Sequence, residues 1–124
     1  MFLLAALHNL IGGFIFIFGY SWIYGTVDAL PPQPGVHYQT WIGLIFIFGL
    51  IYYMIYQDMY AGRKLVIIGI LGKLNSAAPM FYGIVTGNPL VPWLFVIPVI
   101  TDISFTVYFI AFFVHARRNQ LWTP

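Results

Sequence analysis

Two charged side chains lie inside long apolar stretches of this sequence, and they are its strongest candidates for chemistry. Lys73 occurs in the segment GILGKLNSAAP and Asp102 in the segment VITDISFTVYF. A charged side chain at the centre of a membrane helix costs about 2.5–3.5 kcal/mol on insertion scales, so such residues commonly mark functional sites. An acid and a base in such a setting can take up and release protons. We therefore consider Asp102 first, and Lys73 second, as candidate catalytic residues.

The sequence leaves open whether Lys73 and Asp102 form a pair. At about 1.5 Å per residue, Lys73 lies about 12 Å and Asp102 about 18 Å from the same end of their helices. Helical side chains lean toward the N-terminus, which widens this gap between antiparallel neighbours. An error of about two to four residues in the segment bounds would close it. Otherwise Lys73 extends toward the headgroups and an unpaired Asp102 holds a proton.

Five further polar residues fall at a similar depth and could complete a polar layer between the helices. They are His8, Asn9, Tyr52, Ser76 and Thr106. Their simpler interpretation is hydrogen bonding between helices, at about 0.6 kcal/mol per contact. The chain has three histidines and no cysteine. Because no metal-ligand spacing occurs around His8, we expect no metal, haem or other cofactor.

Four segments are long and apolar enough to position these residues as membrane-spanning helices. About 20 mainly apolar residues are needed to cross a hydrocarbon core of about 30 Å. The segments cover residues 2–24, 40–57, 65–85 and 93–114. The first is interpreted as a retained span, because its apolar stretch is longer than that of a signal peptide and no basic leader precedes it. The first connection cannot continue a helix, because it contains Pro31, Pro32 and Pro34.

Prolines also lie inside the third and fourth segments. Pro79 and Pro98 are each expected to kink their helix and to free a backbone carbonyl. Pro98 precedes Asp102 by four residues, so a cavity could form beside the acid. Prolines without any such role are also common in membrane helices.

The composition agrees with a chain that is surrounded by lipid. Of the 124 residues, 61% are hydrophobic and only 6% are charged, whereas a soluble domain carries about 25% charged residues. The net charge of +2 and the lack of a basic stripe exclude a nucleic-acid partner. Without cysteine, disulfides and thiol chemistry are also excluded.

The distribution of cations predicts the orientation. Arg63 and Lys64 lie between the second and third segments, and Arg117 and Arg118 follow the fourth. The other two connections contain no Lys or Arg, so all four cations share one side with both termini, which the positive-inside rule assigns to the cytoplasm. The tryptophans that fit the outer interface of this layout are Trp22, Trp41 and Trp93. We predict an all-α, integral membrane four-helix bundle, up-down-up-down and N-in/C-in, as a single domain over residues 1–124.

The stretch FGLIYYMIYQDMYAGRKLVIIGILGKL, together with VITDISFTVYFIAFF, resembles small bacterial four-span membrane proteins that are loosely DoxX-like. These share a Gly-Tyr-rich second span, a basic turn, a Gly-Lys-Leu element and an Asp past the middle of the fourth span. The matching residues are Gly49, Tyr52, Tyr53, Arg63, Gly72, Lys73 and Asp102. The resemblance covers about residues 43–113 and departs at Met59, where a proline would be expected. It implies a four-span fold in a bacterial cytoplasmic membrane and highlights Lys73 and Asp102, but it implies no reaction.

Two functions are expected. The first is an accessory or assembly subunit of a larger membrane complex, in contact with lipid and other membrane subunits. Small residues that suit close helix packing support it, and they are Gly43, Gly49, Gly69, Gly72, Ala77 and Ala78. The alternative is a small membrane enzyme or carrier for an apolar substrate, a quinone or a lipid, in which Asp102 and Lys73 handle protons. No nucleophile–base arrangement supports an enzyme, so we lean toward the first.

Overall fold

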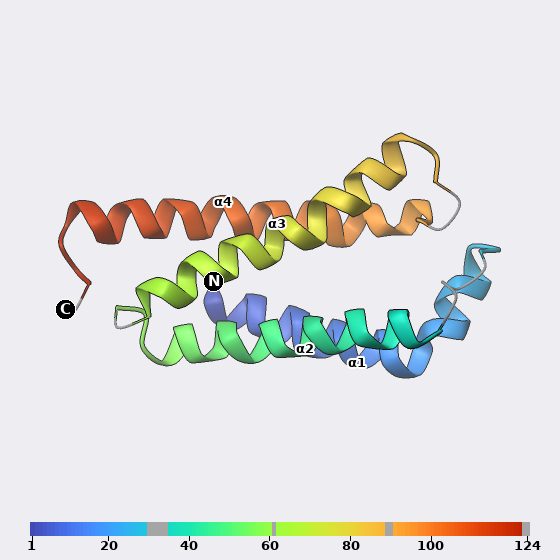
Figure 1. Ribbon diagram of the computed structural model, residues 1–124, viewed down its shortest axis with the longest axis horizontal. Helices are drawn as coiled ribbons and strands as arrows, with labels where there is room; N and C mark the ends of the chain where they lie inside the picture. The colour runs from blue at the N-terminus through green and yellow to red at the C-terminus, as the bar shows by residue number, and fades with distance from the viewer. Residues whose placement is uncertain (30–34, 61, 89–90, 123–124) are drawn as a thin grey trace.

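The computed structural model is all-helical and describes residues 1–29, 35–60, 62–88 and 91–122 (Figure 1). Its elements are α1 (Phe2–Thr26), α2 (Gly35–Gln57), α3 (Arg63–Val85), a short 3₁₀ helix η1 (Trp93–Phe95) and α4 (Val96–Arg118). The helices α1, α2 and α3, and α4 together with η1, are each long and apolar enough to cross a membrane. This confirms the predicted all-α fold with four potential spans and is typical of a multi-pass membrane protein.

Two helices extend well beyond the segments predicted from apolar composition. α2 begins at Gly35 rather than at residue 40, and α4 ends at Arg118 rather than at residue 114. A helix that has formed adds one hydrogen bond with each further residue, so it continues into polar sequence where the apolar count ends. The predicted proline-rich connection at Pro31, Pro32 and Pro34 lies outside the described residues.

Local turns close the first and third helices. After α1, Asp28 adopts a φ of 51° and the Ala29 amide donates to the Tyr24 carbonyl at 3.0 Å. After α3, Gly87 adopts a φ of 67° and the Asn88 amide donates to the Gly83 carbonyl at 2.8 Å. A left-handed residue after a helix satisfies the carbonyls that the last turn leaves without a partner.

The two prolines act differently. Pro79 lies in the interior of α3, as expected. Pro98 is the third residue of α4, the helix that follows η1 directly. In the first turn of a helix a backbone N–H has no partner within the helix, so a proline there breaks no hydrogen bond. Pro98 therefore lies in the first turn of α4 and does not kink the interior of the helix.

The helices associate as two pairs. α1 contacts α2 extensively and α3 contacts α4 extensively, while α2 and α3 make fewer contacts (Figure 1). A first apolar cluster joins all four helices and consists of Phe2, Ala5, Ala6, Tyr52, Ile55, Val66, Phe105 and Phe109. A second cluster lies around the other ends of α1 and α2 and consists of Tyr24, Tyr38, Ile42 and Phe95. The polar residues in the middle of the helices lie between these two clusters.

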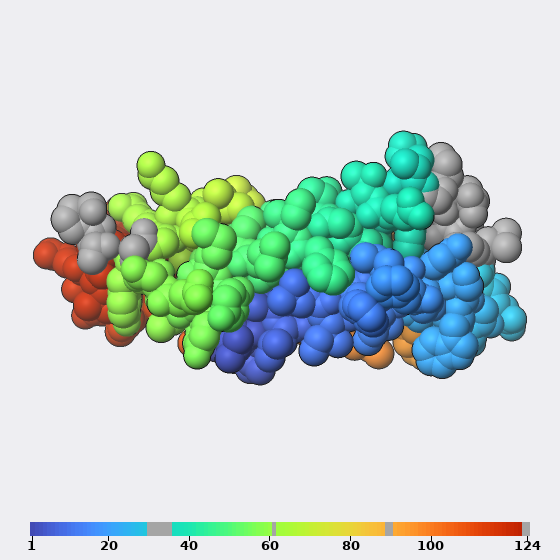
Figure 2. Space-filling view, turned by 90° about the horizontal axis from the view of Figure 1, so that it is seen from below, coloured from blue at the N-terminus to red at the C-terminus, as the bar shows by residue number. Residues whose placement is uncertain are grey.

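Large apolar side chains cover the outside of the molecule. Phe18, Trp22 and Tyr82 are 74%, 72% and 70% exposed. Figure 2 shows one long face of the molecule, which α1 and α2 cover for most of its length. Exposed apolar area on this scale is stable in lipid and not in water, so the surface agrees with the apolar character of the helices.

Candidate functional site

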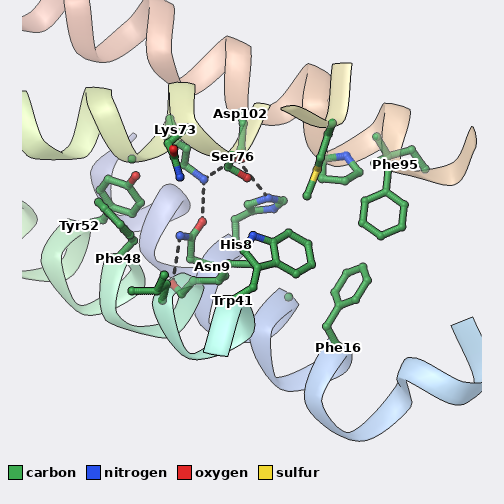
Figure 3. A pocket seen from close by; sticks show the side chains of 18 residues that line it. His8, Asn9, Phe16, Trp41, Phe48, Tyr52, Lys73, Ser76, Phe95 and Asp102 are labelled. Atoms are coloured by element: carbon green, nitrogen blue, oxygen red, sulfur yellow. Dashed lines mark hydrogen bonds and ion pairs between the residues drawn. The ribbon is translucent and has the colours of Figure 1, made fainter. Parts of the chain in front are cut away.

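Lys73 and Asp102 form a direct pair in the centre of the molecule. The Lys73 Nζ lies 2.5 Å from the Asp102 Oδ1, and the two residues are only 2% and 5% exposed (Figure 3). Lys73 belongs to α3 and Asp102 to α4. The pairing that the sequence left open is therefore made, and Lys73 does not extend to the surface.

The two side chains meet because α4 extends past the beginning of α3. The Arg63 guanidinium, at the start of α3, lies 5.7 Å from the centre of the Phe113 ring, so Phe113 rather than Arg118 is level with it. Lys73 is ten residues from Arg63, and Asp102 is eleven residues from Phe113. At about 1.5 Å per residue these depths agree within about 2 Å. Predicted depths that were counted from the segment ends ignored this offset.

Asn9 connects the pair to the other two helices. Its Oδ1 accepts a hydrogen bond from the Lys73 Nζ at 2.6 Å, and its Nδ2 donates to the Ile45 carbonyl at 3.2 Å. Asp102, Lys73, Asn9 and Ile45 come from α4, α3, α1 and α2 respectively. We call these four residues the polar node. It is a continuous chain of hydrogen bonds through all four helices.

Aromatic rings cover the ammonium group of Lys73. Its Nζ lies 5.3 Å from the centre of the Tyr52 ring and 5.1 Å from that of Phe105, within the range of cation–π attraction. The Tyr52 hydroxyl points elsewhere and donates to the Gly69 carbonyl at 3.0 Å. Tyr52 thus belongs to the site through its ring, while its hydroxyl joins α2 to α3.

The other predicted site residues are placed around the node in different ways. His8 approaches it, with Nε2 3.8 Å from the Asp102 Oδ1, and its side chain is 35% exposed. The Thr106 hydroxyl donates to the Asp102 backbone carbonyl at 2.8 Å and so does not reach the carboxylate. Ser76 is half-buried and forms no side-chain hydrogen bond with another described residue. Of these three residues, His8 is thus the one whose side chain lies beside the carboxylate of Asp102.

A cavity of about 250 Å³ lies against the polar node. Lys73, Asp102, His8, Asn9 and Ser76 all line it. Its aromatic walls are Phe16, Trp41, Phe48, Tyr52 and Phe95. In Figure 3 Phe16 and Phe95 lie at the end of the cavity opposite Tyr52. A mostly apolar space with a few convergent polar groups is the usual form of a small-molecule site.

The node leaves hydrogen-bonding capacity for a molecule in this cavity. An ammonium group has three N–H donors, and Lys73 uses two of them for Asp102 and Asn9. The carboxylate of Asp102 uses one oxygen for Lys73. The arrangement can therefore bind or exchange a proton with one polar group. Within the described residues no three His, Asp or Glu side chains gather as a metal site.

Besides the apolar walls, sequence reasoning missed Trp41 and Gly12 as contributors to the cavity. Trp41 was assigned to the outer interface, yet it is half-buried and lines the cavity. Gly12 lines the cavity as well, and a Cβ atom added there would meet no other atom within 4 Å. The signal for Gly12 was its position three residues after Asn9, which places both on one face of α1. No comparable signal marked Trp41.

No protein family, curated protein or solved structure matches this chain. The resemblance to the DoxX-like group therefore stays a prediction. Any function has to be argued from the cavity and the polar node.

Proposed function

We propose that this protein binds an apolar molecule with one polar head, of the quinone or lipid type, in the cavity beside Lys73 and Asp102. The observation that carries the proposal is the cavity itself, about 250 Å³ in volume, with apolar and aromatic walls and a buried ion pair on one side. In this proposal the polar head contacts the node, where Lys73 and Asp102 handle protons, and the apolar part lies among the aromatic rings.

The cavity has walls that also face the surroundings of the protein. Leu44 and Ile97 line it and are 49% and 60% exposed. Leu44 belongs to α2 and Ile97 to α4, on helices that in a bilayer would have acyl chains as their neighbours. This supports entry of the ligand from the lipid phase, without passage through water.

Gly12 and Gly43 provide a matched test. Gly12→Leu places a side chain in the cavity with no initial clash, because a Cβ atom there meets nothing within 4 Å. Gly43 has equally open space but does not line the cavity. We expect mass spectrometry of the protein, purified in mild detergent, to find a small apolar molecule bound to the wild type and to Gly43→Leu and at least tenfold less on Gly12→Leu. Equal amounts on both variants would refute the proposal.

The second candidate is an accessory or assembly subunit of a larger membrane complex. It is favoured by the open position at Gly43 and by the exposed Ala78, because small residues on an outer face let another helix approach closely. The other small residues are already used inside the chain, for example Gly69 against Tyr52 and Gly72 against Phe48. A large heteromeric particle after mild solubilisation would favour this candidate, whereas a monomer or homodimer with a bound small molecule would favour the first.

We further propose that the helices thread an up-down-up-down path through a bacterial cytoplasmic membrane, with both termini inside. The contact between Arg63 and the Phe113 ring supports it, because it brings the cations at residues 63–64 and 117–118 toward one end of the molecule. The stacking of Phe2 on Phe109, with ring centres 4.5 Å apart, brings the start of α1 toward the same end. The positive-inside rule then assigns this end to the cytoplasm.

A further inference from the structure

A second cavity continues the first toward the end of the molecule at which α1 ends. It has a volume of about 340 Å³, and Trp41, Asn75, Ser76, Met80 and Phe95 line both cavities. Its remaining walls are Tyr24, Pro79 and Val91. Tyr24 lies two residues before the end of α1, and Val91 lies just before η1. The two cavities together therefore lead from that end of the molecule to the polar node.

Polar groups without partners point to what fills the second cavity. Tyr24 is only 2% exposed, yet its hydroxyl forms no hydrogen bond with any described residue. The side-chain hydrogen-bonding groups of Trp41 and Ser76, which are half-buried, and of Asn75, which is exposed, also form none within the described ranges. Among the described residues only the Trp122 Nε1 is a fully enclosed polar side-chain atom without a partner, so the Tyr24 hydroxyl is open to the cavity. Nearly all polar groups in such a position bind protein or ordered water.

The space is large enough for water. A water molecule needs a cavity of at least about 10–15 Å³ and two to four polar partners. The second cavity exceeds this volume many times over, and four side chains with polar groups line it. An apolar tail in this position would leave the Tyr24 hydroxyl without a partner, whereas water satisfies it.

We propose that the two cavities form a hydrated passage. It runs from the end of the molecule at which α1 ends and α2 begins to the Lys73–Asp102 pair. The passage admits water and small hydrophilic molecules at least as far as Ser76. It is a polar route that is separate from the lipid-side entry proposed above. Without an apolar ligand in the first cavity water reaches the ion pair, and with a ligand bound there water still fills the second cavity as far as Ser76. It would supply the water or protons that reach Asp102.

The chain has no cysteine, so single cysteines can report on the passage. In Ser76→Cys the new thiol lies in the wall that both cavities share, and we expect it to react with a small, charged, membrane-impermeant methanethiosulfonate reagent. Thr101→Cys is the matched control. By the offset between α3 and α4 it lies at nearly the same depth, but it lines neither cavity. We expect Ser76→Cys to react at least tenfold faster, and from the same side as a cysteine at His37.

A block in the second cavity tests the route. Val91 lines only the second cavity, and Val91→Phe should slow the reaction of Ser76→Cys at least tenfold without changing that of His37→Cys. If Val91→Phe fails to fold, Pro79→Trp provides the same block. Equal rates at residues 76 and 101, or no effect of either block in a folded protein, would overturn the passage. If Gly12→Leu lost the ligand while the thiol of Ser76→Cys reacted at an unchanged rate, the hydrated passage would stand. The ligand site and the passage can therefore be refuted independently.

Discussion

The ammonium group of Lys73 is held by a carboxylate oxygen, an amide oxygen and the faces of two aromatic rings. Removal of the acid or the base alone leaves the remaining charge buried without its counterion. In soluble proteins, breaking a buried pair in this way costs about 3–5 kcal/mol, whereas replacing both partners by apolar groups is often nearly neutral. The contributions of Lys73 and Asp102 to stability are therefore expected to be strongly coupled.

A double-mutant cycle measures this coupling. We expect Lys73→Met and Asp102→Leu each to lower the free energy of unfolding by about 3–5 kcal/mol, and the double variant to lose clearly less than their sum. Unfolding in mixed micelles of increasing sodium dodecyl sulfate gives these free energies. Arg118→Met, at the exposed end of α4, is the control and should change little. Strictly additive losses would contradict a direct pair.

Asn9 and Asn75 allow a comparison between a side-chain amide that forms hydrogen bonds and one that forms none with the described residues. Asn9 accepts from the Lys73 Nζ and donates to the Ile45 carbonyl, whereas Asn75 has no side-chain hydrogen bond with another described residue. We expect Asn9→Leu to destabilise the protein by about 1–3 kcal/mol, because a buried donor and a buried acceptor lose their partner. Asn75→Leu should stay within about 0.5 kcal/mol of the wild type. The same micelle titration provides both values. Equal losses of unfolding free energy in the two variants would show that the hydrogen bonds of Asn9 do not stabilise the polar node.

Much of the site at this scale could be predicted from the sequence, because a charge inside an apolar stretch is conspicuous. Lys73 and Asp102 were identified in this way, and Asn9 was placed at a suitable depth. Their pairing could not be predicted, because it depends on the overhang of α4 beyond Arg63, which local sequence does not encode. The roles of Trp41 and Tyr24 at the cavities also depend on packing between helices, so position relative to the interface was not sufficient to find them.

Among the helices, α2 and α3 approach closely at a glycine. A Cβ atom on Gly69 would lie 2.9 Å from the Tyr52 ring, and Tyr52 is fully buried with its hydroxyl bonded to the Gly69 carbonyl. The ring therefore cannot move away without loss of that hydrogen bond. The contact between the two helix pairs depends on this small residue.

Alanine at two glycines tests the close approach. Gly69→Ala should destabilise the protein by about 1–3 kcal/mol through overpacking against Tyr52. Gly43→Ala adds a methyl group in open space and should be neutral or stabilising by up to about 1 kcal/mol, because alanine favours a helix over glycine. Circular dichroism during thermal unfolding in detergent compares the two. Equal melting temperatures would show that the ring has room to move.

The whole molecule has an uneven distribution of cations, which leads to a prediction about its orientation. Under the proposed threading, cysteines at Gln57 and Leu121 face the cytoplasm and a cysteine at His37 faces outward. In intact bacterial cells an impermeant thiol reagent should label only His37→Cys, and permeabilisation should expose the other two. If the cysteines at residues 57 and 121 were labelled from opposite sides, the threading would be wrong while the helical fold would stand.

The separation of the charged partners along the chain has a consequence for biosynthesis. Asp102 follows Lys73 by 29 residues. Lys73 in α3 is therefore synthesised before Asp102, its partner in the ion pair. At about 5–20 residues per second, this delay lasts roughly 1.5–6 s. Asn9, 64 residues upstream of Lys73, has already been made by then. The nascent lysine can thus meet its amide acceptor first, and the carboxylate arrives when the last helix enters the bilayer.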